Sequence, residues 1–231
     1  MASSARPAII GPDSGPEAPY PLRMEGPVIR GFGRGSKELG IPTANLPVDP
    51  ATAPWITDCV SGVYFGWALL EGGTEDGSAS STGTSGGGGG GGASAAAGPP
   101  PEPTLYPMVM SIGYNPFYNN KTRTAEVHIL HTFASDFYGA YLRLAILGFV
   151  RPERGDYPSL DALVADIRFD CAVARRSLAR PAWTPAGVPV VAADVDHANA
   201  DEDGDAPKAT AGEGGATGTL QVRGLLPEGP Q

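Results

Sequence analysis

The apolar residues of this chain fall into short runs separated by polar or Gly-rich stretches, and most runs have the composition of strands. Four runs, residues 61–70, 106–113, 122–131 and 141–150, are rich in β-branched and aromatic side chains and lie between Gly, Pro or Asn residues. This pattern predicts four strands. Residues 141–150 are apolar nearly throughout, as expected of a central strand, and Val28-Ile29 resembles the end of a further strand.

From Ser159 onward, the spacing of the apolar residues changes to that of an amphipathic helix. Ser159 suits the N-cap, Asp161 suits the first turn, and Pro181 ends the helix. The apolar stripe of this helix consists of Leu160, Leu163, Val164, Ile167, Cys171, Ala174 and Leu178. The stripe needs an apolar surface, and the preceding strands offer one. We therefore expect a mainly β fold, a small antiparallel barrel with a C-terminal helix, although the pattern alone does not separate a barrel from a sandwich.

Composition divides the chain into one folded domain and low-complexity segments. Gly and Pro supply 33 and 24 of the 231 residues, and Gly86–Gly92 is an unbroken glycine run. Such segments bury too little apolar surface to offset their ordering entropy. The expected boundaries are a flexible arm (1–21), a folded domain (22–181) with a disordered Gly/Ser-rich insertion (71–105), and a disordered acidic tail (182–231).

Charge and cysteine content exclude several classes of function. The net charge is −9, and residues 181–231 carry eight acidic and two basic side chains, so the folded part is nearly neutral and nucleic acid is not an expected partner. No apolar run reaches the length of a membrane span, and the N-terminus lacks the features of a secretory signal. Two distant cysteines, Cys59 and Cys171, suggest free thiols in a reducing compartment. We expect a cytoplasmic monomer, with a mitochondrial association as the alternative.

A Gly-rich stretch near the N-terminus has the residue types of a phosphate clamp. Glycines let the backbone approach a ligand closely, bare N–H groups can form an anion-binding concavity, and basic side chains add charge. The residues concerned are Gly31, Gly33, Arg34, Gly35, Ser36 and Lys37. The spacing fits neither a Walker A motif nor the dinucleotide fingerprint. A flexible surface loop remains the alternative.

Thr43 and Asn45 follow this stretch and suggest a metal site. They lie two apart, so in an extended segment their side chains point to the same side. A hydroxyl and an amide oxygen are hard ligands of the kind that Mg²⁺ accepts alongside phosphate oxygens.

The segment G-F-G-R-G-S-K-E-L-G-I-P-T-A-N resembles the signature of eukaryotic riboflavin kinases, and the resemblance covers roughly residues 22–180 apart from the insertion. It implies a six-stranded Greek-key barrel, ATP and riboflavin as substrates, and Mg²⁺, with Zn²⁺ or Mn²⁺ as possible replacements. It also implies that residues 31–37 and Thr43 contact ATP, and that Thr43 and Asn45 hold the metal.

Phosphorylation of an alcohol needs a group that accepts its proton. Period two places Glu126 on one strand face with His128, and few other acids lie within the predicted strands. The segment T-A-E-V-H-I-L-H-T-F resembles the strand that carries the family's catalytic base, which implies that role for Glu126. The alternative is an exposed strand residue with a cross-strand partner.

The segments D-F-Y-G and L-G-F-V-R-P-E match the family near its flavin side. The resemblance therefore implies flavin-side positions for Asp136, Phe137, Tyr138 and Arg151, with Arg151 in a mobile lid. Core packing of Phe137 and Tyr138 remains an equal alternative. Two other functions also remain open: a flavin carrier without catalysis, and a kinase of a different small alcohol on the same scaffold.

Overall fold

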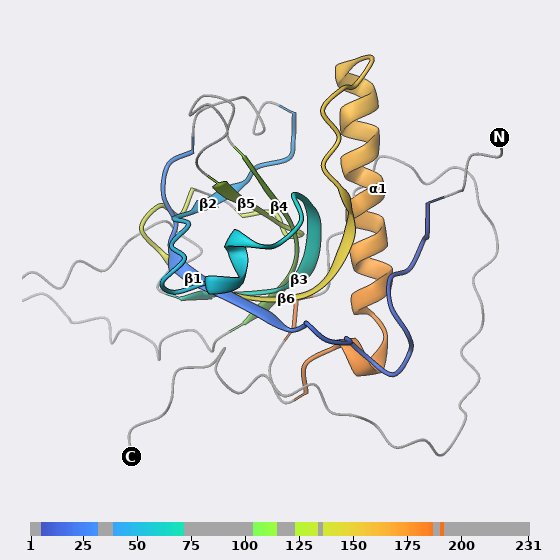
Figure 1. The fold of residues 1–231 in the computed structure, drawn as a ribbon, viewed down its shortest axis with the longest axis horizontal. Helices are drawn as coiled ribbons and strands as arrows, with labels where there is room; N and C mark the ends of the chain where they lie inside the picture. Colours follow the sequence, from blue (N-terminus) through green and yellow to red (C-terminus); the bar gives the residue numbers. More distant parts are fainter. Residues whose placement is uncertain are drawn as a thin grey trace, which may run out of the picture.

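A computed structural model describes residues 6–31, 39–71, 104–114, 123–133, 136–186 and 190–191. Six antiparallel strands form one curled sheet, and one long helix stands beside it (Figure 1). The elements in chain order are β1 (Leu22–Pro27), β2 (Ala44–Leu46), the 3-10 turn η1 (Pro54–Thr57), β3 (Gly62–Glu71), β4 (Leu105–Tyr114), β5 (Arg123–Ile129), β6 (Tyr141–Pro152), α1 (Leu160–Leu178) and the 3-10 turn η3 (Pro181–Trp183).

The sheet has the strand order β1-β6-β3-β4-β5-β2. Strands β3, β4 and β5 pair in succession and β6 returns beside β3, which is the Greek-key arrangement. Just after β1, Ile29 forms an isolated bridge with Asn45 of β2, so the two edges of the sheet meet. The predicted barrel with a C-terminal helix is confirmed.

Apolar side chains fill two layers. Strand residues with alternate spacing, such as Ala125, Val127 and Ile129 of β5, point into the barrel. Residues of the opposite spacing on β3, β4 and β6 pack under α1, for example Phe65 and Val109 against Ala174 and its neighbours. The outer face of β2 and β5 carries polar side chains, among them Asn45, Glu126 and His128.

The helix begins and ends as its sequence predicts. The Ser159 side chain accepts a hydrogen bond from the Ala162 N–H at 3.2 Å, and the helix ends at Leu178. Cys171, Ala174 and Leu178 are buried, but Leu160 is 58% exposed because the first turns of α1 extend beyond the barrel (Figure 1). The predicted stripe therefore contacts the barrel only along its C-terminal part.

Two elements differ from the sequence-based expectation. The three-residue strand β2 lies in the stretch that we interpreted only as a ligand motif. Pro54–Thr57 form the 3-10 turn η1, in a stretch for which no element was predicted. Both elements are too short for a hydrophobic period to show.

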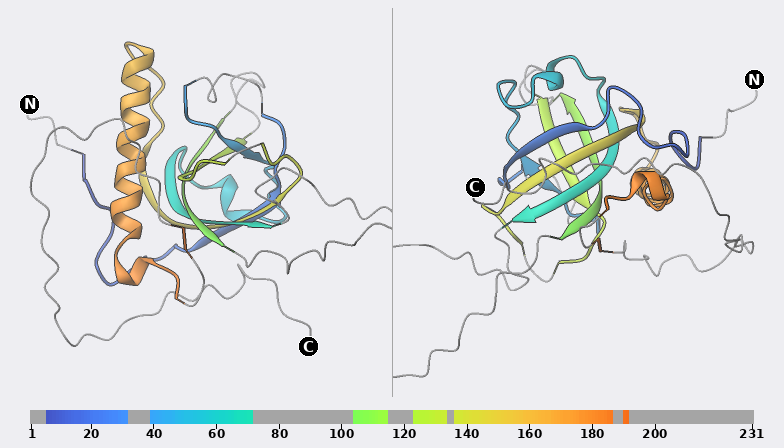
Figure 2. Two further views of the ribbon diagram at one scale, coloured as in Figure 1. Left: turned by 180° about the vertical axis from the view of Figure 1, so that it is seen from behind. Right: turned by 90° about the horizontal axis from the view of Figure 1, so that it is seen from below.

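The N-terminal segment is attached to α1, whereas the sequence predicted a flexible arm over residues 1–21. Arg176 donates to the Ala8 carbonyl at 2.9 Å, Arg180 donates to the Gly11 carbonyl at 2.8 Å, and Trp183 donates to the Pro12 carbonyl at 2.9 Å. Figure 2 shows the segment running beside the helix. We name residues 6–13 the N-terminal strap.

Most of the predicted insertion and tail lies outside the described residues, which do not include 72–103 or 192–231. Val190, which lies in the segment expected to be a disordered tail, forms an isolated bridge with Leu105 at the start of β4. Cys59 and Cys171 are free thiols. Within the described part of the chain, no helix is both long and apolar enough to span a membrane.

Candidate active site

Asn45 and Glu126 lie side by side on the outer face of the sheet. They are direct partners in the antiparallel pairing of β2 with β5, and both are half-buried. Their neighbours Ala44 and Val127 point into the core. Side chains of directly opposed residues share a face with Cβ atoms about 5 Å apart. The structure therefore brings a predicted metal ligand next to the predicted base.

Gly31 lies against the Asn45 side chain. The Ile29 N–H donates to the Asn45 carbonyl at 2.9 Å, and a Cβ added at Gly31 would overlap the Asn45 amide. Only glycine leaves room for that amide, so the Gly-rich stretch begins at the predicted metal ligand. Gly33, Arg34, Gly35, Ser36 and Lys37 lie outside the described residues.

His128 holds the start of β2. Its Nδ1 lies 2.8 Å from the Pro42 carbonyl oxygen, and because a carbonyl only accepts, Nδ1 carries the donated hydrogen. This bond ties Pro42 and the half-buried Thr43 to β5, on the face that carries Asn45 and Glu126. In the part of the chain that the structure describes, no three His, Cys, Asp or Glu side chains gather as a metal site. A metal here would depend on the oxygen atoms of Thr43 and Asn45.

The segment Asp136–Tyr138 lies beside the strand end that leads to Gly31. Val28 exchanges backbone hydrogen bonds with Gly139 and Ala140, at 2.9 and 2.8 Å. The Arg30 guanidinium lies 4.7 Å from the centre of the Tyr138 ring.

The side chains of this segment differ in exposure. Asp136 and Tyr138 are exposed. Phe137 is half-buried and packs on Phe133 with ring centres 4.8 Å apart. Phe137 therefore contributes to the packing of the barrel, whereas the Tyr138 ring is open to solvent.

Arg151 lies on the other side of Glu126. Register pairs Glu126 with Ser111, Ser111 with Val63, and Val63 with Arg151, so these residues form one row across β5, β4, β3 and β6. Measured along the curved sheet, three strand spacings separate Glu126 from Arg151, or about 14 Å. We name this line of residues the cross-sheet row.

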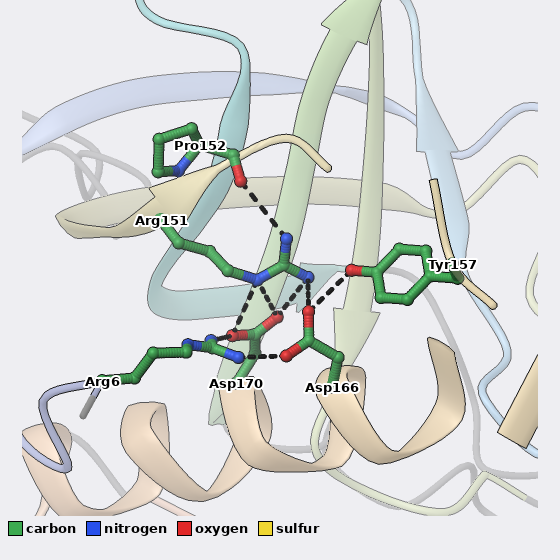
Figure 3. A network of polar contacts seen from close by, with 6 residues as sticks. All are labelled: Arg6, Arg151, Pro152, Tyr157, Asp166 and Asp170. Atoms are coloured by element: carbon green, nitrogen blue, oxygen red, sulfur yellow. Dashed lines mark hydrogen bonds and ion pairs between the residues drawn. The ribbon is translucent and has the colours of Figure 1, made fainter. Parts of the chain in front are cut away.

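Arg151 is held by two carboxylates of α1 (Figure 3). Its Nε lies 3.0 Å from one Asp170 oxygen, and its NH2 group lies 3.0 Å from Asp166 and 2.9 Å from Asp170. Arg6 of the strap contacts the same two carboxylates, and the Tyr157 hydroxyl donates to Asp166 at 2.6 Å. Arg151 was expected in a mobile lid, but in the structure it belongs to β6 and is tied to the helix.

Burial and neighbouring charges shift the pKa values of Asp170 and Arg151 in opposite directions. The Asp170 side chain is 1% exposed, and its burial raises the pKa of the carboxyl, while Arg151 and Arg6 act to lower it. Desolvation lowers the pKa of Arg151, but the two carboxylates outweigh it and the net shift is upward, so the guanidinium stays charged. A cavity of about 380 Å³ borders the network. Its lining consists of Arg6, Pro7, Phe149, Val150, Arg151, Pro152, Arg154 and Asp166.

Sequence reasoning missed Arg6, Arg30, Tyr157, Asp166 and Asp170. The available signal was the pair Asp166 and Asp170, which are four residues apart and so share one face of the helix. Their arginine partners are distant in sequence, and no local pattern identifies them.

Comparison with known protein families decides the family. The flavokinase model, described as riboflavin kinase, matches residues 18–178. The chain belongs to the riboflavin kinase family.

Individual riboflavin kinases of fungi are similar along most of the chain. The riboflavin kinase of Chaetomium globosum is 64% identical over 197 residues, covering 80% of this chain and 83% of that protein. The Pyricularia oryzae riboflavin kinase is 57% identical over 188 residues, covering 80% and 84%. Among solved structures, the riboflavin kinase of Trypanosoma brucei is 27% identical with a TM-score of 0.49, covering 71% of this chain and 84% of that one.

Proposed function

We propose that this riboflavin kinase family member transfers the γ-phosphate of ATP to the 5′-hydroxyl of riboflavin and releases FMN and ADP. Family membership supports the reaction. The single structural observation that supports it most is the direct pairing of Asn45 with Glu126 beside Gly31. In this proposal Glu126 is the carboxylate base, Asn45 is an oxygen donor for a metal, and the phosphate arm begins at Gly31, which together are the groups that phosphoryl transfer requires.

Glu126 is the general base in this proposal. Its carboxylate accepts the proton of the 5′-hydroxyl as that oxygen attacks the γ-phosphorus in line with the departing ADP. The P–O bond to ADP breaks as the new P–O bond forms, and no phospho-enzyme is involved. Its place in the middle of β5, between the paired strands β2 and β4, keeps the base on a rigid element.

Thr43 and Asn45 would hold the metal. Their hydroxyl and amide oxygens suit Mg²⁺, which keeps several water ligands and takes few from the protein, and Mn²⁺ accepts the same donors. Zn²⁺ favours His and Cys ligands, which fits this site less well. A bound Mg²⁺ supplies positive charge to the phosphate oxygens. Gly31 starts the arm that binds those phosphates, and Gly33, Arg34, Gly35, Ser36 and Lys37 continue it.

The acceptor is proposed to lie along the cross-sheet row. Its hydroxyl end lies at Glu126, and its ring end extends toward Arg151, about 14 Å away along the sheet. Riboflavin, a three-ring system with a five-carbon chain, has a comparable length. Asp136, Phe137 and Tyr138 lie on the other side of Asn45, next to Arg30, and they remain proposed flavin-side positions.

The test is an ATP and Mg²⁺ assay on riboflavin, with FMN separated by chromatography. Glu126→Gln should lower kcat by about 10²- to 10⁴-fold, the usual contribution of a general base. Riboflavin binding, followed by quenching of its fluorescence, should persist because the amide keeps the shape of the carboxylate.

The matched control is Glu25→Gln. Glu25 is also a strand glutamate, on β1, and its carboxylate lies 3.6 Å from Arg143 on the neighbouring strand. This variant should keep activity within about twofold, as expected for an exposed ion pair. Quenching without FMN from the wild type would favour a flavin carrier, and neither signal would favour a kinase of another alcohol.

A further inference from the structure

The N-terminal strap reaches the cross-sheet row through one side chain. Arg6 binds Asp166 and Asp170 on α1, which are the same two carboxylates that hold Arg151 (Figure 3). Two guanidinium groups thus face two carboxylates, and the charges balance. Without Arg6, two acids on adjacent helical turns would face Arg151 alone.

We propose that Arg6 is a positioning residue that acts on riboflavin binding through Arg151. The inference rests on the proposed function, in which Arg151 marks the ring end of the acceptor. Arg6 itself is not catalytic, since it contacts Arg151 only through the shared acids.

The geometry of Arg151 explains why its position depends on Arg6. Its Nε and NH2 groups point to the acids, and its NH1 group donates to the Pro152 carbonyl at 3.2 Å. The Asp170 carboxylate accepts hydrogen bonds from both arginines, and its side chain is almost fully buried. Removal of one arginine leaves a buried negative charge that pulls the other toward the helix, because an unpaired buried charge is costly.

The loop between β6 and α1 is fixed by the same acids at both of its ends. Arg151 and Pro152 precede the loop, and Tyr157, near its end, donates to Asp166 at 2.6 Å. Arg6 and Pro7 also line the cavity beside Arg151. Arg6 and Arg151 therefore border the same cavity, with the two acids behind them.

The strap has its own attachment to the helix, independent of Arg6. Arg176 and Arg180 donate to strap carbonyls, and Ile10 donates to the Ser177 hydroxyl at 2.9 Å. The Arg6 guanidinium also lies 4.6 Å from the centre of the Phe169 ring. Substitution of Arg6 should therefore leave the strap in place and change only its end.

The experiment is steady-state kinetics on the full chain with riboflavin and ATP varied separately. Arg6→Gln should raise KM for riboflavin about tenfold with kcat within about twofold and KM for ATP unchanged, since it removes a binding contribution common to the ground and transition states. Arg6→Lys keeps the positive charge but lacks the forked guanidinium that contacts both carboxylates. It should therefore keep part of the affinity for riboflavin.

A double-mutant cycle distinguishes an effect of Arg6 on the position of Arg151 from a general loss of stability. In the Arg151→Gln background, Arg6→Gln should add no further rise in KM for riboflavin, because its effect passes through Arg151. The matched control is Arg168→Gln, which removes the same charge from an exposed position of α1 and should leave both KM values unchanged.

Three results would overturn the inference while leaving the proposed function intact. These are a wild-type KM in Arg6→Gln despite a lower melting temperature, equal changes in both KM values, and an additive effect in the Arg151→Gln background. A folded wild type that produces no FMN would instead overturn the proposed function, and this inference with it.

Discussion

At the scale of single residues, the important property of Gly31 is that it has no side chain. A side chain there would occupy the space of the Asn45 amide. Gly31→Ala should therefore displace Asn45 and lower kcat/KM for ATP by about 10- to 100-fold, because a shift of about 1 Å in a reacting group has effects of this size. Kinetics with ATP as the varied substrate measure this.

Gly155→Ala is the control for that substitution. A Cβ at Gly155 meets no atom within 4 Å, so alanine should be neutral or slightly stabilising. If Gly31→Ala kept wild-type kinetics with ATP, the contact between Gly31 and Asn45 would have no part in nucleotide binding.

The raised pKa of Tyr64 should make the free energy of unfolding depend on pH in the alkaline range. Its hydroxyl donates to the Val60 carbonyl at 2.6 Å, and burial, together with the nearby Cys59, raises its pKa. The folded protein keeps this proton at pH values where the unfolded chain loses it. The resulting stability is complete below about pH 10 and declines as the pH rises above it, by up to about 1.4 kcal/mol per pH unit.

Tyr64→Phe should remove that part of the pH dependence. The variant should be about 1 kcal/mol less stable at pH 8, where the hydrogen bond is lost, and its free energy of unfolding should fall less than that of the wild type between pH 10 and 11. Urea unfolding at both pH values measures it. Parallel curves for the two proteins would show that Tyr64 does not titrate with unfolding.

At the scale of elements, the stability of α1 depends on its N-cap residue, Ser159. Its N-terminal turns extend beyond the barrel, so the Ser159 cap replaces part of the missing tertiary contact. Ser159→Ala should lower the free energy of unfolding by about 1 kcal/mol. Ser159→Asp, which retains a capping oxygen and a favourable charge, should stay near the wild type. Equal losses in both variants would contradict a capping role.

Long elements could be predicted from the sequence, and short ones could not. Strands β3 to β6 and helix α1 were identified within two residues or so because their apolar periods run over seven or more positions. The strand β2 has three residues between Pro42 and Pro47, so its pairing with β5 is visible only in the structure. That pairing joins Asn45 to Glu126, two residues that the sequence had identified separately.

At the scale of the whole molecule, contacts between distant segments were beyond sequence reasoning. The strap lies in a segment whose prolines and glycines predict flexibility, and its order comes from Arg176 of α1 and Arg180 just after α1, which no local pattern identifies as its partners. Arg6 and Asp170 are 164 positions apart. Arg151 was identified through the family resemblance, but its partners, and its place in line with Glu126, required the register of four strands.

The hairpin of β3 and β4 has a consequence for how this family can change over time. Leu69 pairs directly with Leu105, so the chain between them leaves and re-enters the sheet at adjacent points. Closing a connection about eight times longer than a tight turn costs only about 2 kcal/mol more. The length of this connection can therefore change between species at a cost of no more than a few kcal/mol in stability, and the same position should accept a genetically encoded tag or reporter.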